Sequence, residues 1–221
     1  AGWPVTIATA GTCAANPPVY NGVSVADIDG DRDMEIIVTA GVACTTISAF
    51  HHTGATVSGW PKDFSVALCN TCCANSWPIC PSPAAGDING DGATDLVGAT
   101  YSGNIYVLNG SGTTLSGWGP LNTGASLRAS PVIVNMDTDL VPEIIIATAA
   151  ATNNILAYNY DGSAVSGYPK SAKGAVGASI SVADVDSNKV PELFVADTTG
   201  RVSVIHAGSS SFADARVWPM F

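Results

Sequence analysis

A short stretch of the chain, "VADIDGDRDMEII" (25–37), carries five acidic side chains in nine consecutive positions, from Asp27 to Glu35. Carboxylates held this close repel one another, by ~1 kcal/mol per pair at ~4 Å in water and by more near a protein surface. The stretch therefore needs either a cation or full solvation. Its spacing favours a cation, because oxygen-bearing side chains fall at positions 1, 3, 5 and 9 of a loop and position 7 offers a backbone carbonyl. Alternating oxygens suit Ca²⁺, which takes roughly 6–8 of them, and a solvated acidic turn is the alternative for one copy alone.

The same spacing occurs three more times, in "GDINGDGATDLV", "VNMDTDLVPEIII" and "ADVDSNKVPELFV", at steps of 60, 48 and 49 residues. Such repetition is the signature of a repeat architecture. The four loops hold 14 of the 18 acidic residues, so four bound Ca²⁺ would bring the formal charge from −10 to about −2. The acidity is thus local and directed at metal. With only 8 Lys and Arg and no basic run, the sequence argues against nucleic acid as a partner.

An EF-hand is the alternative type of calcium loop, and the flanking residues argue against it. That loop needs a bidentate Glu at position 12 and a helix on each side. Position 12 is here Val38, Gly98, Ile146 or Val195. The segments after the loops are short, apolar and rich in β-branched residues, which indicates buried strands.

Each repeat divides into four predicted strands, with the acidic loop between the first two. In the third copy the strands are 130–135, 143–149, 154–160 and 165–171, and the last follows a turn at Asp161-Gly162. Four short strands in each unit of ~50 residues indicate a β-propeller blade. Proline in the fourth strand suits an outer edge, where a missing N–H is tolerated. At 221 residues we expect one domain, residues 1–221.

The second copy with its flanks, "DINGDGATDLVGATYSGNIYVLNGSG…SGWGP", resembles the FG-GAP/VCBS repeat of integrin-like, calcium-binding β-propellers of the bacterial secreted type. The resemblance implies an all-β, propeller-like array of four four-stranded blades, at about 20–66, 83–122, 130–173 and 179–221. It implies Ca²⁺ as the cofactor, in up to four sites. The implied side-chain ligands are Asp27, Asp29, Asp31, Glu35, Asp87, Asn89, Asp91, Asp95, Asn135, Asp137, Asp139, Glu143, Asp184, Asp186, Asn188 and Glu192, and the implied main-chain carbonyls are those of Asp33, Ala93, Val141 and Val190.

The loops depart from the family pattern at two positions. The family's glycine at loop position 6 remains only as Gly92, and Arg32, Leu140 and Lys189 replace it elsewhere, where a positive φ would strain them. Asn135 removes a charge from the first ligand position of the third loop. We therefore predict that calcium occupancy is strongest in the first loop and weakest in the third and fourth.

Six cysteines bear on the compartment. Cys13 and Cys44 are isolated, and the other four lie together in "CNTCCANSWPIC" (69–80), whose spacing is not that of a zinc finger. We predict disulfides rather than zinc, with Cys13 paired to Cys44 and the other four paired among themselves. Disulfides imply an oxidising environment, so a secreted or cell-surface protein is expected.

Catalysis has little support in the sequence, and we predict that the chain is not an enzyme. No G-x-S-x-G, Cys–His or HExxH pattern occurs. His51 and His206 share one repeat position, which Asn109 and Asn159 fill in the other copies, so the histidines are predicted to form hydrogen bonds at strand ends. No apolar run approaches 18 residues, and no membrane span is predicted.

Two non-enzymatic functions fit the repeat. One is an adhesion or structural assembly subunit, which could form filaments. The other is a lectin-like, carbohydrate-binding module, for which Tyr20, Asn75 and Trp77 are the candidate contacts. The expected partner is accordingly an extracellular protein, a glycan or another copy of the chain. The propeller of a polysaccharide lyase is the weaker, enzymatic alternative.

The aromatic-Pro segment occurs five times, although the calcium loop occurs only four times. The additional copy, Trp3-Pro4 in "GWPVTIA", makes residues 1–9 an extra N-terminal outer strand without a blade of its own. An apolar strand of this kind is a pairing hazard. It belongs either to an earlier blade outside this chain or to a contact with another subunit, by strand addition or end-to-end packing. We expect the second, and a head-to-tail contact can propagate into a filament.

Overall fold

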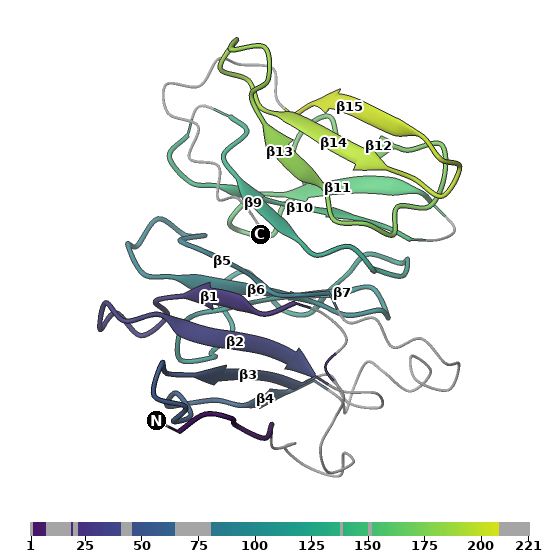
Figure 1. Ribbon diagram of the computed structural model, residues 1–221. Helices are drawn as coiled ribbons and strands as arrows, with labels where there is room; N and C mark the ends of the chain where they lie inside the picture. The colour runs from purple at the N-terminus through teal and green to yellow at the C-terminus, as the bar shows by residue number, and fades with distance from the viewer. Residues whose placement is uncertain are drawn as a thin grey trace.

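The described part of the chain is all-β. The computed structural model describes residues 2–7, 19, 22–40, 46–64, 81–137, 139–149 and 152–207, and these residues contain fifteen strands and no helix (Figure 1). The strands are β1 (Ser24–Ala26), β2 (Glu35–Ala40), β3 (Thr46–Phe50), β4 (Lys62–Asp63), β5 (Ala84–Gly86), β6 (Asp95–Ala99), β7 (Asn104–Leu108), β8 (Leu121–Asn122), β9 (Val132–Val134), β10 (Glu143–Ala147), β11 (Asn154–Tyr158), β12 (Lys170–Ser171), β13 (Ser181–Ala183), β14 (Glu192–Ala196) and β15 (Val202–His206).

The strands form four antiparallel sheets in chain order, β1–β4, β5–β8, β9–β12 and β13–β15, and within each sheet neighbours in sequence are neighbours in space. Each acidic loop joins the first and second strands of its sheet. The predicted array of four propeller-like blades is therefore confirmed. The last sheet has three strands among the described residues, because its predicted fourth strand falls in 208–221, outside them. The outer strands β4 and β12 directly follow Pro61 and Pro169, as the tolerance of edge strands for proline predicts.

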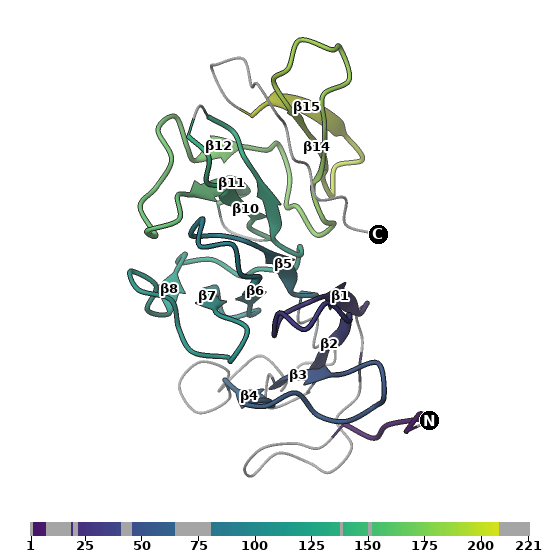
Figure 2. The same cartoon turned by 90° about the vertical axis from the view of Figure 1, so that its left-hand side faces the viewer.

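The four sheets follow one another along the long axis of the molecule (Figure 1). Figure 2 shows the same order from the side, with the first and last sheets at opposite ends. The first strands of successive sheets lie together, since β5 contacts both β1 and β9. The described residues thus form an open array of blades.

Hydrophobic cores fill the spaces between successive sheets. We call the side of a sheet that faces the next sheet its forward face, and the opposite side its rear face. The core between the third and fourth sheets joins Ile145 and Ile155 on a forward face to Leu193 and Val195 on a rear face. Equivalent cores join the first sheet to the second and the second to the third. Because both faces are covered, strands such as β10 are apolar at consecutive positions rather than at alternate ones.

In three described aromatic-Pro segments the aromatic residue also links its sheet to the next one. It donates a hydrogen bond to a backbone carbonyl that occupies one fixed position of the repeat, in the turn after the third strand. The three pairs are Trp60 Nε1 to Gly110 O (2.8 Å), Trp118 Nε1 to Tyr160 O (2.6 Å) and Tyr168 Oη to Ala207 O (3.0 Å).

The N-terminal segment differs from the predicted outer strand. Residues 2–7 belong to none of the described β-ladders, and they contact the first sheet through the turn that follows β3. Trp3 Nε1 donates to His52 O at 2.8 Å, and the Gly2 N–H donates to Thr53 O at 3.0 Å. His52 is the residue of the first sheet that corresponds to Gly110 in the second.

Several predictions fall outside the described residues and stay predictions. These are both disulfide assignments, since all six cysteines lie there, and the candidate glycan contacts Tyr20, Asn75 and Trp77. The fifth aromatic-Pro segment, Trp218-Pro219, lies there as well. In the part of the chain that is described, no helix is long and apolar enough to cross a membrane.

Candidate metal centres

The last predicted ligand of each loop is a buried carboxylate at the first residue of the second strand. These four residues are at most 1% exposed. In every loop one carboxylate oxygen accepts a hydrogen bond from the backbone N–H of loop position 2, which closes the loop onto the sheet. The pairs are Glu35 with Ile28 (3.0 Å), Asp95 with Ile88 (3.1 Å), Glu143 with Met136 (2.5 Å) and Glu192 with Val185 (3.0 Å).

The first predicted ligand shapes the backbone of three loops. Its carboxylate accepts a hydrogen bond from the N–H of position 6: Asp27 from Arg32 (3.0 Å), Asp87 from Gly92 (2.9 Å) and Asp184 from Lys189 (2.9 Å). All three residues at position 6 have positive φ, 76° for Arg32, 86° for Gly92 and 68° for Lys189. The predicted strain is therefore confirmed at Arg32 and Lys189, where a Cβ makes the left-handed conformation costly.

The third loop departs from this pattern. Asn135 replaces the aspartate, and its amide nitrogen donates to Asp139 O at 2.7 Å. A donor stands where the other loops have an acceptor, and Leu140 is not among the described residues with positive φ. The prediction of strain at Leu140 is therefore wrong, because the third loop lacks the hydrogen bond from position 6 to position 1 that accompanies a positive φ in the other loops.

Three loops bring their carboxylates close enough to share a cation. One oxygen or nitrogen atom of each member lies within 4.8 Å of the corresponding atoms of the others in these groups: Asp29, Asp31, Glu35 and His51; Asp137, Asp139 and Glu143; Asp184, Asp186 and Glu192. Among the described residues the second loop forms no such group, and its last ligand, Asp95, is one methylene shorter than glutamate. The carboxylates at positions 3, 5 and 9 thus converge in the first and third loops, and those at positions 1, 3 and 9 converge in the fourth.

Two of the buried carboxylates, Asp95 and Glu143, indicate that the loops suit a cation. Asp95 Oδ1 is buried and has no hydrogen-bond partner among the described atoms. Burial raises the pKa of Asp95 to about 6, and the nearby Asp91 and Asp87 add to the shift. Burial likewise raises the pKa of Glu143 to about 8, with Asp137 and Asp139 adding to it. Anionic oxygens that are buried, crowded and in one case unpaired fit a hard divalent cation such as Ca²⁺.

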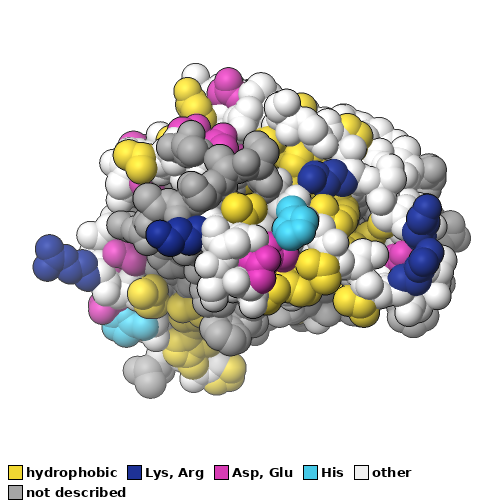
Figure 3. Space-filling view, turned by 90° about the horizontal axis from the view of Figure 1, so that it is seen from above, with side chains coloured by type: hydrophobic (Ala, Val, Ile, Leu, Met, Phe, Trp, Pro, Cys, Tyr) yellow, Lys and Arg dark blue, Asp and Glu magenta, His cyan; other side chains and the backbone are white. Residues whose placement is uncertain are grey.

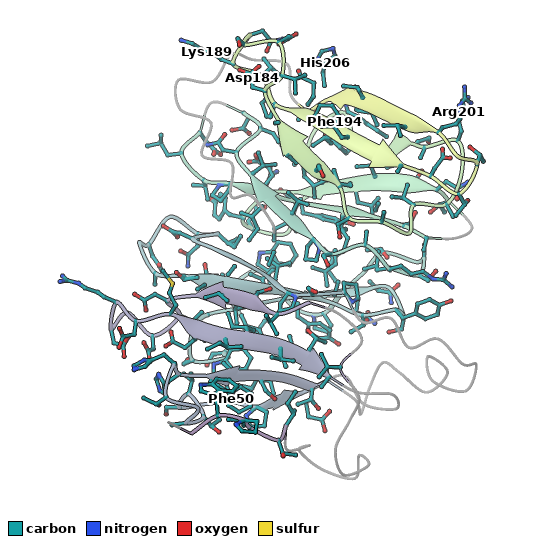
Figure 4. The ribbon with its side chains drawn as sticks, viewed as in Figure 1. Phe50, Asp184, Lys189, Phe194, Arg201 and His206 are labelled. Atoms are coloured by element: carbon teal, nitrogen blue, oxygen red, sulfur yellow. The ribbon has the colours of Figure 1, made fainter. Side chains whose placement is uncertain are left out.

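Histidines accompany two of the sites, a feature that the sequence pattern did not assign to the metal loops. His51 Nδ1 lies 3.2 Å from Glu35 Oε1, and His206 Nδ1 lies 3.1 Å from Glu192 Oε1. The prediction that both histidines form hydrogen bonds at strand ends is confirmed. The signal that could have identified their partner was the strand register, which pairs Glu192 directly with His206. Figure 4 shows Asp184, Lys189 and His206 together at one end of the last sheet, with Arg201 at the other.

The carboxylates of two turns outside the loops are occupied by their own backbone. Asp161 accepts from the Ser163 N–H, and Asp197 accepts from the N–H groups of Thr199 and Gly174. Hydrogen bonds from Ser163 lower the pKa of Asp161, and those led by the Thr199 side chain lower the pKa of Asp197. The assignment of Asp161 to a hairpin turn is confirmed.

The structure also describes the remaining predicted ligands, whose role as calcium ligands stays a prediction. The N–H of each position-7 residue donates to the side chain at position 5, and the role of its carbonyl stays a prediction. The pairs are Asp33 with Asp31, Ala93 with Asp91, Val141 with Asp139 and Val190 with Asn188. Asn89 donates to Asp91 at 3.0 Å, which holds those two side chains together.

Comparison with known proteins identifies the repeat. The FG-GAP repeat family model matches residues 81–112, which hold the second acidic loop with β5, β6 and β7. No curated protein sequence matches the chain. Among solved structures the chain is similar to BBS1N in complex with ARL6DN (10% identity, 86% of this chain and 67% of that chain, TM-score 0.47). It is also similar to the V. cholerae biofilm matrix protein Bap1 (17%, 86% and 40%, 0.45) and to a protein of unknown function from Bacteroides caccae (14%, 86% and 63%, 0.43).

Proposed function

We propose that this chain is a calcium-stabilised, non-catalytic subunit of an extracellular assembly, with an adhesive or structural role. The observation that carries the proposal is that the chain's chemistry is concentrated in its acidic loops. Among the described residues every group of three or more side chains that could hold a metal is built on one of these loops, and His51, in the turn after β3, joins the first group. Asp161 and Asp197, outside the loops, are held by turn N–H groups, which leaves them poorly placed as acid-base catalysts.

Calcium supplies the positive charge that the loops lack. When bound, it would offset the repulsion between converging carboxylates and join the first two strands of each sheet through Asp29, Asp137, Asp186 and their neighbours. The loops already hold much of their backbone in place by hydrogen bonds to their own side chains. Such preorganisation lowers the entropic cost of binding. Up to four Ca²⁺ per chain are proposed.

The assembly role rests on the N-terminal segment. Trp3 reaches the first sheet through the same type of contact that joins one sheet to the next, which supports self-association as the use of this segment. The extracellular setting rests on the six cysteines and on calcium, which is abundant outside cells. A protein held together by calcium loops suits that environment.

Calorimetric titration with Ca²⁺, together with melting in calcium and in EDTA, tests the metal part. We expect binding and a higher melting temperature in calcium. Asp91→Asn should weaken binding, whereas Asp161→Asn, a matched carboxylate outside the loops, should leave it unchanged. Absence of binding with identical melting in EDTA would refute the calcium role. Electron microscopy and sedimentation of the calcium-loaded chain test assembly, and a monomer at high concentration would refute that part.

A further inference from the structure

The first loop differs from the other loops because a nitrogen atom belongs to its group of potential metal ligands. The group combines the carboxylates of Asp29, Asp31 and Glu35 with the imidazole of His51. The groups of the third and fourth loops contain carboxylates alone, and no other group among the described residues includes a histidine. Figure 3 shows histidine side chains beside acidic ones, so membership of the group, and not proximity alone, sets His51 apart.

His51 reaches the first loop because of the register of β2 and β3. Ile36 pairs with Phe50, so the next pair toward the loop is Glu35 and His51. His51 Nδ1 lies 3.2 Å from Glu35 Oε1 and 3.7 Å from Asp29 Oδ2. One nitrogen therefore faces two carboxylates that belong to the same loop.

The histidine of the fourth loop is placed differently. His206 occupies the same repeat position and contacts Glu192, but it does not belong to the group of the fourth loop. Its side chain is 68% exposed, compared with 27% for His51. A histidine at this position thus joins the donor atoms of the loop in the first sheet and not in the last.

The second and third sheets carry asparagine at this position and use it within their own turns. Asn109 Oδ1 accepts from the Thr113 N–H at 2.9 Å. Asn159 Nδ2 donates to Ser163 Oγ at 2.8 Å. Neither contact involves an acidic loop, so the imidazole of His51 is an addition specific to the first loop.

Another carboxylate of the first loop is used to shape its backbone. Asp27 accepts from the Gly30 N–H at 2.7 Å with one oxygen and from the Arg32 N–H at 3.0 Å with the other. Asp27 is not in the group. The convergent donors are therefore three carboxylates and one imidazole, which is a full set for a four-coordinate ion.

The type of donor decides which cation this set prefers. Ca²⁺ takes oxygen ligands, whereas imidazole nitrogen suits Zn²⁺ and the neighbouring first-row transition ions. Bonds of about 2.0–2.1 Å in a tetrahedral zinc site place the donor atoms about 3.3 Å apart. The distances of 3.2 Å and 3.7 Å from His51 Nδ1 are close to that spacing. Spacing alone would also suit Ca²⁺, so the nitrogen is the discriminating feature.

We propose that the first loop is a mixed nitrogen–oxygen site that binds a divalent transition cation of the Zn²⁺ class in preference to Ca²⁺. The ligands are Asp29, Asp31, Glu35 and His51. His51 binds through Nδ1 in its neutral form, with the ring proton on Nε2. Ca²⁺ remains the ion of the loops that offer only oxygen. This inference rests on the proposed role of the loops as cation sites and names the ion class of one of them.

The test titrates the calcium-loaded chain with Zn²⁺ by calorimetry and with Co²⁺ by visible absorption. Co²⁺ is a spectroscopic substitute for Zn²⁺, and its tetrahedral complexes absorb more strongly than its octahedral ones. We expect one ion per chain, the absorption of tetrahedral Co²⁺, and its loss when Zn²⁺ displaces Co²⁺. In the proton NMR spectrum of the Co²⁺ form, a strongly shifted imidazole N–H resonance should report coordination by histidine without any substitution.

His51→Asn is the decisive variant, because the repeat itself places asparagine at this position. The His51 N–H donates to Ala55 O at 2.9 Å, as the Asn109 N–H donates to Thr113 O at 2.8 Å, so the turn should be preserved. The variant should weaken Zn²⁺ binding at least about 100-fold, since loss of a direct ligand should cost no less than loss of an outer partner. Its Ca²⁺ binding should be unchanged. His206→Asn, the same change in the fourth loop, should alter neither titration.

The outcomes separate this site from the calcium role of the loops. Equal Zn²⁺ binding by the parent and His51→Asn would place the ion elsewhere in the chain and overturn the inference, while the calcium role would stand. Ca²⁺ binding without Zn²⁺ binding would lead to the same conclusion. Failure to bind either ion would overturn both. Zn²⁺ binding that depends on His51, in a chain that does not bind Ca²⁺, would support the site and refute the calcium role.

Discussion

Calcium binding to the third loop should release a proton near neutral pH. With a pKa of about 8, Glu143 is roughly 90% protonated at pH 7. A carboxylic acid must lose its proton to become a calcium ligand, so binding should release about 0.9 proton at pH 7 from this residue. The apparent affinity of the loop should rise about tenfold between pH 7 and pH 9 as deprotonation is completed. Asp95, with a pKa of about 6, should add only ~0.1 proton at pH 7.

Calorimetry in two buffers of different ionisation enthalpy measures this release directly. Glu143→Gln should reduce the total release at pH 7 by about one proton, because it removes both the ligand and its proton. In the calcium-free protein the raised pKa acts on stability. It contributes stability that is fully present below pH 4.5, the ordinary pKa of the group, and is lost as the pH rises through about 8. Heats independent of the buffer, with an affinity that is flat from pH 7 to 9, would refute the reasoning.

Three further substitutions test the packing of the sheets and the loops. Trp118→Phe should lower stability by about 1–2 kcal/mol in denaturant unfolding, since it removes a buried indole hydrogen bond to the next sheet; an unchanged midpoint would contradict this. Gly110→Ala should cost about 1–3 kcal/mol, because its Cβ would collide with a backbone carbonyl of the first loop, whereas Gly119→Ala meets nothing within 4 Å and serves as control. Arg32→Gly should raise the calcium-loaded stability by about 1 kcal/mol by relieving a positive φ, while Leu140→Gly, without that φ, should give no gain.

The fold was largely predictable because the repeat supplies the same information four times. The spacing of the acidic residues placed a loop, and the apolar runs on either side placed two strands, so the element order followed. The strand ends were less accurate: the predicted strand 165–171 is only Lys170–Ser171 in the structure. The sequence overestimates the length of this strand, because its apolar residues pack between sheets and do not pair in a ladder. The hydrogen bond from Tyr168 to Ala207 shows this packing.

The metal loops were predictable in composition but not in geometry. The spacing identified the carboxylates that converge, such as Asp137, Asp139 and Glu143. It did not identify the backbone change caused by Asn135, because that change depends on exchanging a hydrogen-bond acceptor for a donor. It also could not place His51 beside Glu35, since that contact depends on the pairing of two strands.

The four loops differ in the surroundings of the second oxygen of their last carboxylate, and this difference has a consequence for the whole array. In the first and fourth loops that oxygen faces a histidine nitrogen, at 3.2 Å and 3.1 Å. In the second loop it has no described partner, and in the second and third loops burial raises the carboxyl pKa. The two inner loops therefore hold buried carboxylates that are costly to ionise without a cation. These loops belong to the sheets β5–β8 and β9–β12, which pack against a neighbour on both sides. Loss of calcium should consequently weaken the array from its middle, where each sheet supports two others.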